Sequence, residues 1–182
     1  ELETLKKKAD EFSAYENLII IGNGGSINNS YAYYQALDSK KNVCFVKTME
    51  PGFLQQVAGK YPKENSLVIA ISKSGTTVGV LESLMFFINR DYNVVGITEE
   101  KGTLYEICKK KNYTVIPHPE VGGRFSANTS CALFPAALMG LDIKKLNNGF
   151  LSAYENFSPE KDINNNPALR LASKLYELEQ HG

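Results

Sequence analysis

The sequence predicts an α/β fold in which a five-stranded parallel sheet lies between two layers of helices, an open and doubly wound three-layer α/β/α sandwich. Strand-like and helix-like patterns alternate along most of the chain, which is the order that a parallel sheet requires. The runs at 17–21 and 67–71 are short and almost wholly apolar, as expected of strands covered on both faces. Each of these runs breaks into a turn rich in glycine or hydroxyl residues that opens a helix.

Hydrophobic spacing gives the individual elements. Strands are expected at 17–21, 43–46, 67–71, 93–98 and 113–116. Helices are expected at 2–14, 26–37, 51–61, 76–89 and 104–111, and then at 126–141, 144–155 and 167–180.

The ends of this pattern suggest how the chain is organised. Residues 117–123 are expected to form a loop, because Pro117 and Pro119 lack a backbone N–H. We expect one domain at 1–156, followed at 157–182 by a helical segment that leads to a second domain absent from this chain.

Composition excludes several classes of function. The 182 residues are 43% hydrophobic, enough for one core, and 20 basic residues balance 20 acidic ones. We therefore expect no general attraction to nucleic acid or to an anionic membrane, and with no leader or membrane span in the sequence we expect a cytoplasmic protein. Cys44, Cys108 and Cys131 show no CxxC spacing, which argues against a disulfide framework and against zinc, so we expect buried thiols. We also expect no cofactor.

The first turn, Gly22-Asn23-Gly24-Gly25-Ser26, places three glycines where the chain bends sharply. Glycine lets a backbone approach a ligand closely, and Ser26 stands at the start of the next helix. The motif lacks the third glycine of a dinucleotide fingerprint, and no GKS or GKT follows as in a P-loop. Turn geometry alone is the alternative reason for these glycines.

The second turn, Ser72-Lys73-Ser74-Gly75-Thr76-Thr77, gathers four hydroxyls and one ammonium before a helix. These donors outnumber the acceptors that such a loop can offer, and a phosphate dianion would satisfy them. The alternative is a helix N-cap with surplus hydroxyl residues.

The two turns together resemble the sugar isomerase (SIS) domain, a flavodoxin-like fold. With Gly122-Gly123-Arg124-Phe125-Ser126, the chain is similar to the glucose-6-phosphate isomerase family in particular. The segment Asn166-Pro167-Ala168 is similar to one that lies between the two SIS domains of that family. The resemblance extends from Asn17 to Tyr176 and identifies the chain as an amino-terminal SIS domain.

The resemblance also implies a substrate and a site. The substrate is glucose 6-phosphate or fructose 6-phosphate, interconverted through a cis-enediolate without metal or nucleotide. Arg124 would face the reacting carbons and stabilise the developing oxyanion, whereas a surface salt bridge or stacking on Phe125 is its structural alternative. The phosphate would be held by Ser72, Lys73, Ser74, Thr76 and Thr77, and the sugar side lined by Gly25, Ser26 and Gly123.

The sequence also departs from the family. The glutamate, histidine and lysine that serve proton transfer and ring opening there lie downstream of the Asn-Pro-Ala segment and have no matching position here. Gly79 stands where the family commonly has a glutamate. His118 and Glu120, just before GGRF, are candidates for a local base, although a loop histidine and a solvated glutamate are the simpler interpretation.

Two other functions remain open at this point. One is a stand-alone sugar-phosphate sensor that performs no chemistry, and the other is a small aldose-ketose isomerase of the phosphoheptose type with its site between subunits. The expected partners are a sugar phosphate and either a second copy, as a homodimer, or a second SIS domain.

Overall fold

The computed structural model describes residues 1–181 and divides the chain into two units, Glu1–Ile143 and Lys144–Gly182. Gly182, the last residue of the expected helical segment, lies outside the described residues. The first unit ends before the expected boundary at residue 156 and holds the whole sheet.

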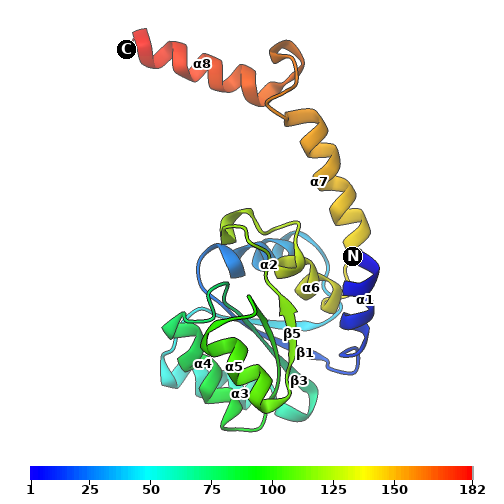
Figure 1. Ribbon diagram of the computed structural model, residues 1–182, viewed down its shortest axis with the longest axis vertical. Helices are drawn as coiled ribbons and strands as arrows, with labels where there is room; N and C mark the ends of the chain where they lie inside the picture. Colours follow the sequence, from blue (N-terminus) through cyan, green and yellow to red (C-terminus); the bar gives the residue numbers. More distant parts are fainter. Residues whose placement is uncertain (182) are drawn as a thin grey trace. The chain divides into compact units, whose positions relative to one another are not determined.

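The sheet has five strands in the order β2-β1-β3-β4-β5, and every neighbouring pair is parallel (Figure 1). This confirms the predicted sheet. Pro117 extends the last strand by pairing with Thr98, and a proline is tolerated there because this strand lies at the edge of the sheet. The strands are β1 (Asn17–Ile21), β2 (Asn42–Val46), β3 (Ser66–Ile71), β4 (Asn93–Thr98) and β5 (Thr114–Pro117).

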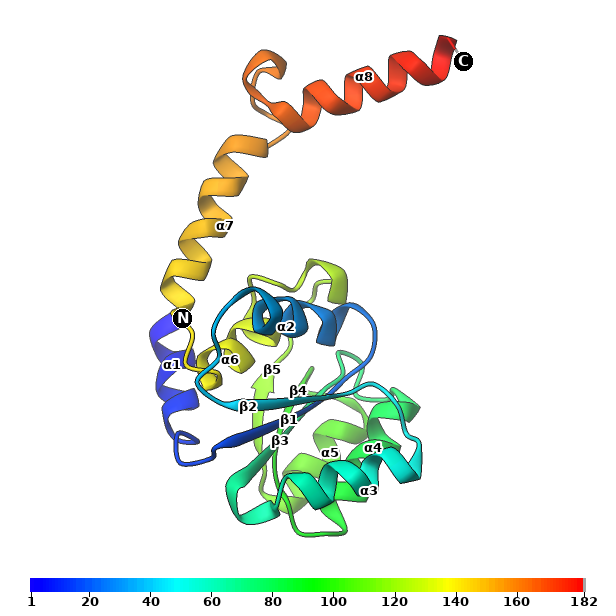
Figure 2. The same ribbon diagram turned by 180° about the vertical axis from the view of Figure 1, so that it is seen from behind.

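Helices cover both faces of the sheet, which completes the predicted three-layer sandwich (Figures 1 and 2). The crossover after β1 passes over one face and the later crossovers pass over the other, as right-handed connections to strands on opposite sides require. One face carries α1 (Leu2–Asp10), α2 (Gly25–Ala36) and α6 (Ser130–Leu138), and the other carries α3 (Pro51–Lys60), α4 (Val78–Ile88) and α5 (Gly102–Lys111), with a short 3-10 turn η1 (Lys63–Asn65) before β3.

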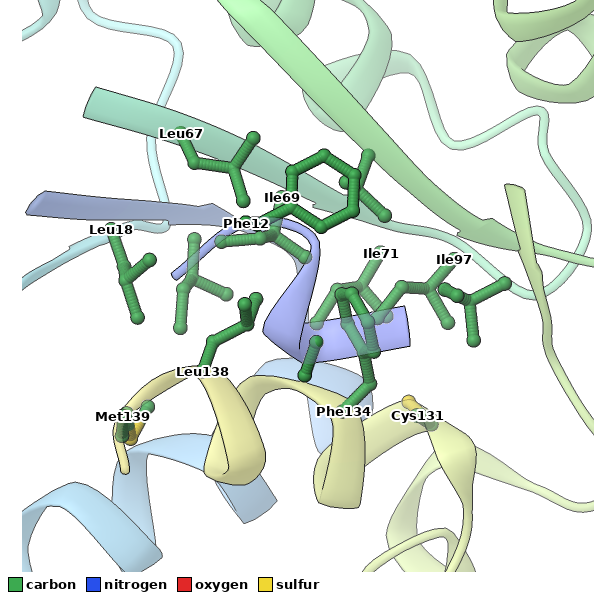
Figure 3. Close-up of a cluster of buried hydrophobic side chains, with 14 of the residues drawn as sticks. Phe12, Leu18, Leu67, Ile69, Ile71, Ile97, Cys131, Phe134, Leu138 and Met139 are labelled. Carbon is green, nitrogen blue, oxygen red and sulfur yellow. The ribbon is translucent and has the colours of Figure 1, made fainter. Parts of the chain in front are cut away.

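Alternate strand residues point into two separate cores. On one face Phe134 of α6 and Phe12 meet edge to face, with ring centroids 6.4 Å apart, above apolar residues of the central strands (Figure 3). On the other face Phe87 and Tyr92 pack in the same manner. Two of the three thiols, Cys108 and Cys131, are buried as predicted, and burial raises the pKa of each to about 11, whereas Cys44 is half-buried.

The expected helix at 126–141 is wrong at its start, because α6 begins at Ser130. Thr129 is its N-cap and accepts a hydrogen bond from the Cys131 N–H, so the helix begins where a cap is available. The residues before it form a 3-10 turn, η2 (Gly123–Phe125). This irregular segment carries Gly123, Arg124 and Phe125 of the GGRFS motif.

The second unit contains α7 (Ile143–Phe157) from its second residue onward, a 3-10 turn η3 (Ile163–Asn165) and α8 (Pro167–His181). Buried Asn166 organises it: its Oδ1 accepts from the N–H groups of Ala168 and Leu169, and its Nδ2 donates to the Ser158 carbonyl. Pro167 takes the first helical position, as the sequence predicts. Within residues 1–181, no helix is both long and apolar enough to cross a membrane.

Truncating Phe134 tests the first of the two cores. Phe134→Ala removes a fully buried ring, so we expect the free energy of unfolding to fall by about 3–5 kcal/mol, measured by urea denaturation followed by circular dichroism. Phe157→Ala, at a half-exposed ring, is the control and should change the unfolding free energy little. Equal losses in both variants would contradict the assigned core.

Candidate functional site

The two predicted turns lie side by side at the point where the sheet reverses its strand order. The chain leaves β1 toward β2 on one side, and from β3 it continues toward β4 on the other. Ile21 pairs with Ala70, so the turns that follow β1 and β3 emerge side by side at the carboxyl end of the sheet. In open α/β sheets this place, outside the carboxyl ends of the strands, is where ligands bind.

A pocket of about 390 Å³ opens there. Five of the residues predicted to bind substrate, Ser26, Ser72, Lys73, Ser74 and Thr77, line it together. Four lining residues were not predicted to bind substrate: Asn23 belongs to the first turn, Ile71 ends β3, and Glu99 and Lys101 belong to the loop after β4. Only the strand order could have indicated Glu99 and Lys101. Because β4 lies beside β3, the residues that follow these two strands reach the same end of the sheet.

The hydroxyls of the second turn form two pairs. Ser72 Oγ lies 2.9 Å from Thr77 Oγ1, and Ser74 Oγ lies 2.9 Å from Thr76 Oγ1. A hydroxyl has one proton to donate, so each pair consumes one O–H and leaves the other for an anion. Thr77 is the N-cap residue of α4, yet its side chain caps no backbone N–H. The first N–H groups of α4 therefore lack the partner that a helix cap would supply, which argues against the simple N-cap interpretation.

The loop after β4 fixes the conformation of the second turn. The Glu99 N–H donates to the Lys73 carbonyl at 3.1 Å, and the Leu104 N–H donates to the Gly75 carbonyl at 2.9 Å. Gly75 has φ +68°, and a Cβ there would lie 2.8 Å from the Lys101 carbonyl oxygen. Only glycine fits this close approach.

The third motif packs backbone to backbone on the first. A Cβ on Gly25 would lie 2.5 Å from the Arg124 nitrogen, and one on Gly123 would lie 2.8 Å from Ser26 Oγ. Asn29 on α2 donates to the Gly123 carbonyl at 2.9 Å and to Ser126 Oγ at 3.1 Å. Gly25 and Gly123 thus hold two loops together and are not among the residues that line the pocket.

Arg124 and Thr76 are also not among the lining residues. The Arg124 side chain is exposed, and its guanidinium carbon lies 5.9 Å from the centroid of the Phe125 ring. This is the stacking that the sequence left open as an alternative. The backbone of Arg124 is nevertheless fixed beside Gly25, at the same edge of the sheet as the pocket.

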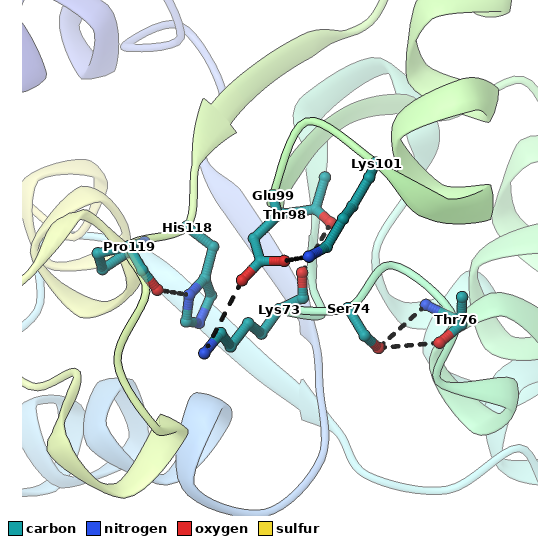
Figure 4. A network of polar contacts seen from close by, with 8 residues as sticks. All are labelled: Lys73, Ser74, Thr76, Thr98, Glu99, Lys101, His118 and Pro119. Atoms are coloured by element: carbon teal, nitrogen blue, oxygen red, sulfur yellow. Dashed lines mark hydrogen bonds and ion pairs between the residues drawn. The ribbon is translucent and has the colours of Figure 1, made fainter.

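Charged groups gather beside the four hydroxyls of the second turn, Ser72, Ser74, Thr76 and Thr77, which we call the hydroxyl cradle (Figure 4). Glu99 pairs with Lys101 at 2.7 Å and with Lys73 at 3.8 Å. The hydrogen bond from Lys101 holds the pKa of the Glu99 carboxyl below its usual range; burial opposes this shift, and the charges of Lys101, Lys73 and His118 add to it. His118 lies in the loop after β5, as expected, but it is only 4% exposed, whereas Glu120 is exposed. The His118 Nδ1 lies 2.8 Å from the Pro119 carbonyl oxygen, and its buried Nε2 has no hydrogen-bond partner within residues 1–181.

Solved structures define the class of the fold. The sugar isomerase domain of an RpiR transcription factor from Sphaerobacter thermophilus matches with a TM-score of 0.56 over 84% of each chain, at 11% identity. A hypothetical protein from Thermus thermophilus matches with a TM-score of 0.87 and 26% identity, over 96% of this chain and 45% of that one. The chain thus has the sugar isomerase fold that its motifs predict.

Sequence relatives narrow the class, although no protein-family model matches the chain. It is 32% identical over 173 residues to the glucose-6-phosphate isomerase of Methanocaldococcus jannaschii, covering 89% of this chain and 42% of the relative. A probable glucose-6-phosphate isomerase of Methanococcus maripaludis is 36% identical, with coverages of 85% and 39%. A solved glucose-6-phosphate isomerase from Chlamydia trachomatis matches with a TM-score of 0.65 and 25% identity, over 75% and 29% of the two chains.

The chain is therefore a relative of the glucose-6-phosphate isomerases, as the sequence motifs indicate. It spans about two fifths of the length of the curated relatives named above.

A substitution at Gly25 tests the contact between the first and third motifs. In Gly25→Ala the new methyl group would meet the backbone at Arg124, so we expect a loss of about 1–3 kcal/mol in the free energy of unfolding, measured by urea denaturation. Gly59→Ala is the control, since a Cβ there meets nothing within 4 Å and alanine favours the helix by up to about 1 kcal/mol. A Gly25→Ala variant as stable as the wild type would show that the two loops do not touch as described.

Proposed function

We propose that this chain is the sugar-phosphate-binding domain of a glucose-6-phosphate isomerase, and that it binds glucose 6-phosphate and fructose 6-phosphate. The observation that carries the proposal is the hydroxyl cradle at the reversal point of the sheet, placed before a helix without a side-chain cap. The relation to glucose-6-phosphate isomerases supports the choice of substrate.

The phosphate is assigned to the second turn. Ser72, Ser74 and Thr77 offer hydroxyls that line the pocket, and Thr76 offers one paired with Ser74. The backbone at Lys73 and the start of α4 would offer N–H groups. A hydrogen bond to a charged group contributes about 1.5–3 kcal/mol. The dipole of α4 adds about 0.3–1 kcal/mol for an anion placed at its N-terminus. The directed hydrogen bonds therefore decide the affinity, and the helix dipole assists.

The sugar is assigned to the side of the pocket lined by Ser26, where Gly25 and Gly123 pack behind the wall, with Arg124 toward the reacting carbons. Moving a carbonyl from C1 to C2 passes through a cis-enediolate, and a guanidinium stabilises the oxyanion that develops. Two observations support this role: the Arg124 backbone is fixed against the first turn, and its side chain is exposed at the same edge. We propose that the guanidinium leaves the Phe125 ring to meet the ligand.

The complete reaction is proposed for a larger assembly. This chain offers no counterpart for the glutamate, histidine and lysine of the family, so we expect it to contribute binding and oxyanion stabilisation while proton transfer uses groups beyond it. We propose a homodimer or a second SIS domain as the partner, a cytoplasmic location, and no nucleic acid or membrane partner. Exposed apolar side chains in the second unit support a protein partner, among them Leu151, Tyr154, Leu171, Leu175 and Tyr176.

Binding of fructose 6-phosphate, measured by isothermal titration calorimetry, tests the phosphate assignment. Ser74→Ala and Thr77→Ala each remove one donor to the anion, so we expect the dissociation constant to rise about tenfold in each variant. Ser152→Ala, an exposed serine of the second unit, is the control and should bind as the wild type does.

Unphosphorylated fructose should give no measurable heat in the same experiment. Unchanged affinity in both cradle variants, or equal binding of fructose and its phosphate, would refute the proposed site.

A further inference from the structure

Glu99 is a carboxylate in a pocket otherwise built for an anion. It lines the same pocket as Ser72 and Ser74, and its side chain is only 15% exposed. A carboxylate accepts hydrogen bonds and donates none, and its negative charge repels a phosphate. Because the Glu99 carboxylate repels the proposed phosphate ligand, its place in the pocket needs an explanation.

The backbone around Glu99 holds it in this place. Its N–H donates to the Lys73 carbonyl at 3.1 Å, and its own carbonyl accepts from the Lys101 N–H at 2.7 Å. Buried Thr98 precedes it, with Oγ1 donating to the same Lys73 carbonyl at 3.4 Å. The loop that carries the carboxylate and the loop that forms the cradle are therefore joined.

Two ammonium groups set the charge state of this carboxylate. Lys101 Nζ lies 2.7 Å and Lys73 Nζ 3.8 Å from its oxygens (Figure 4). These contacts lower the pKa of Glu99, so the group is ionised at neutral pH and a weak proton acceptor for catalysis. The ionised Glu99 carboxylate can instead accept a hydrogen bond from a ligand, and it adds negative charge to the pocket.

We propose that Glu99 is a specificity-determining residue, which accepts a hydrogen bond from a sugar hydroxyl of the bound sugar phosphate and rejects small dianions that carry no O–H donor. The inference rests on the proposed function and deepens it. A sugar phosphate brings both an anion for the hydroxyl cradle and donors for the carboxylate. Sulfate brings only the anion, so no hydrogen bond from the ligand offsets its repulsion by the Glu99 carboxylate.

The test is a comparison of two ligands in three proteins. Fructose 6-phosphate and sulfate are titrated by calorimetry, at constant ionic strength, into the wild type, Glu99→Gln and Glu100→Gln. Glutamine keeps the shape of the side chain and removes its charge. Glu100→Gln makes the same change of charge at the next, exposed residue, which is not among those lining the pocket.

We expect the wild type to prefer fructose 6-phosphate over sulfate. In Glu99→Gln sulfate should bind more tightly, and the preference for the sugar phosphate should fall by about tenfold or more, the order expected for one hydrogen bond to a charged group. Glu100→Gln should keep the wild-type preference. An unchanged preference in Glu99→Gln, or a wild type that binds sulfate as tightly as fructose 6-phosphate, would overturn the inference.

Two further results separate the possible failures. If the wild type binds neither ligand, the proposed function fails; if it binds both equally, only the role of Glu99 fails. Glu99→Asp is a second variant in case the glutamine variant does not fold. It keeps the charge but withdraws the carboxylate by one methylene, so sulfate should stay weak while fructose 6-phosphate loses affinity, and a gain in sulfate affinity would contradict the proposal.

Discussion

The candidate site depends on one constraint, the parallel pairing of β1 with β3 between crossovers that run over opposite faces of the sheet. Ile21 opposite Ala70 sets the register, so the glycine turn and the hydroxyl turn emerge together. Because the crossover helices diverge, the N-termini of α2 and α4 open toward the same pocket, and neither has a side-chain cap. Backbone N–H groups at such ends favour an anion.

Close backbone contact turns this edge into a defined pocket. Gly75 accommodates the loop after β4, and Gly25 and Gly123 accommodate each other's segments, so close contacts join four segments that are distant in the sequence into two pairs. The same contacts place one carboxylate, Glu99, among hydroxyl and ammonium groups. A site made only of donors would hold any small dianion, whereas a mixed site distinguishes ligands by the hydroxyls that they carry.

Much of this arrangement was predictable because the local residue patterns agree with the strands and turns that they form. Buried strands such as Asn17–Ile21 read as apolar runs, and hydroxyl crowding marked the second turn before its neighbours were known. The start of α6 was missed because apolar spacing did not reveal the cap at Thr129. Glu99 was missed because a single glutamate after a strand has no motif, and only strand order brings it to the pocket. The stacking of Arg124 on Phe125 likewise depends on the 3-10 turn that carries both.

The central claim is that the turn at 72–77 is an anion cradle, and a crystal structure of the chain grown with fructose 6-phosphate tests it most directly. We expect the phosphate oxygens to accept hydrogen bonds from the Ser74 and Thr77 hydroxyls and from N–H groups at the start of α4. Phosphate density elsewhere, with the cradle hydroxyls still paired to one another, would contradict it.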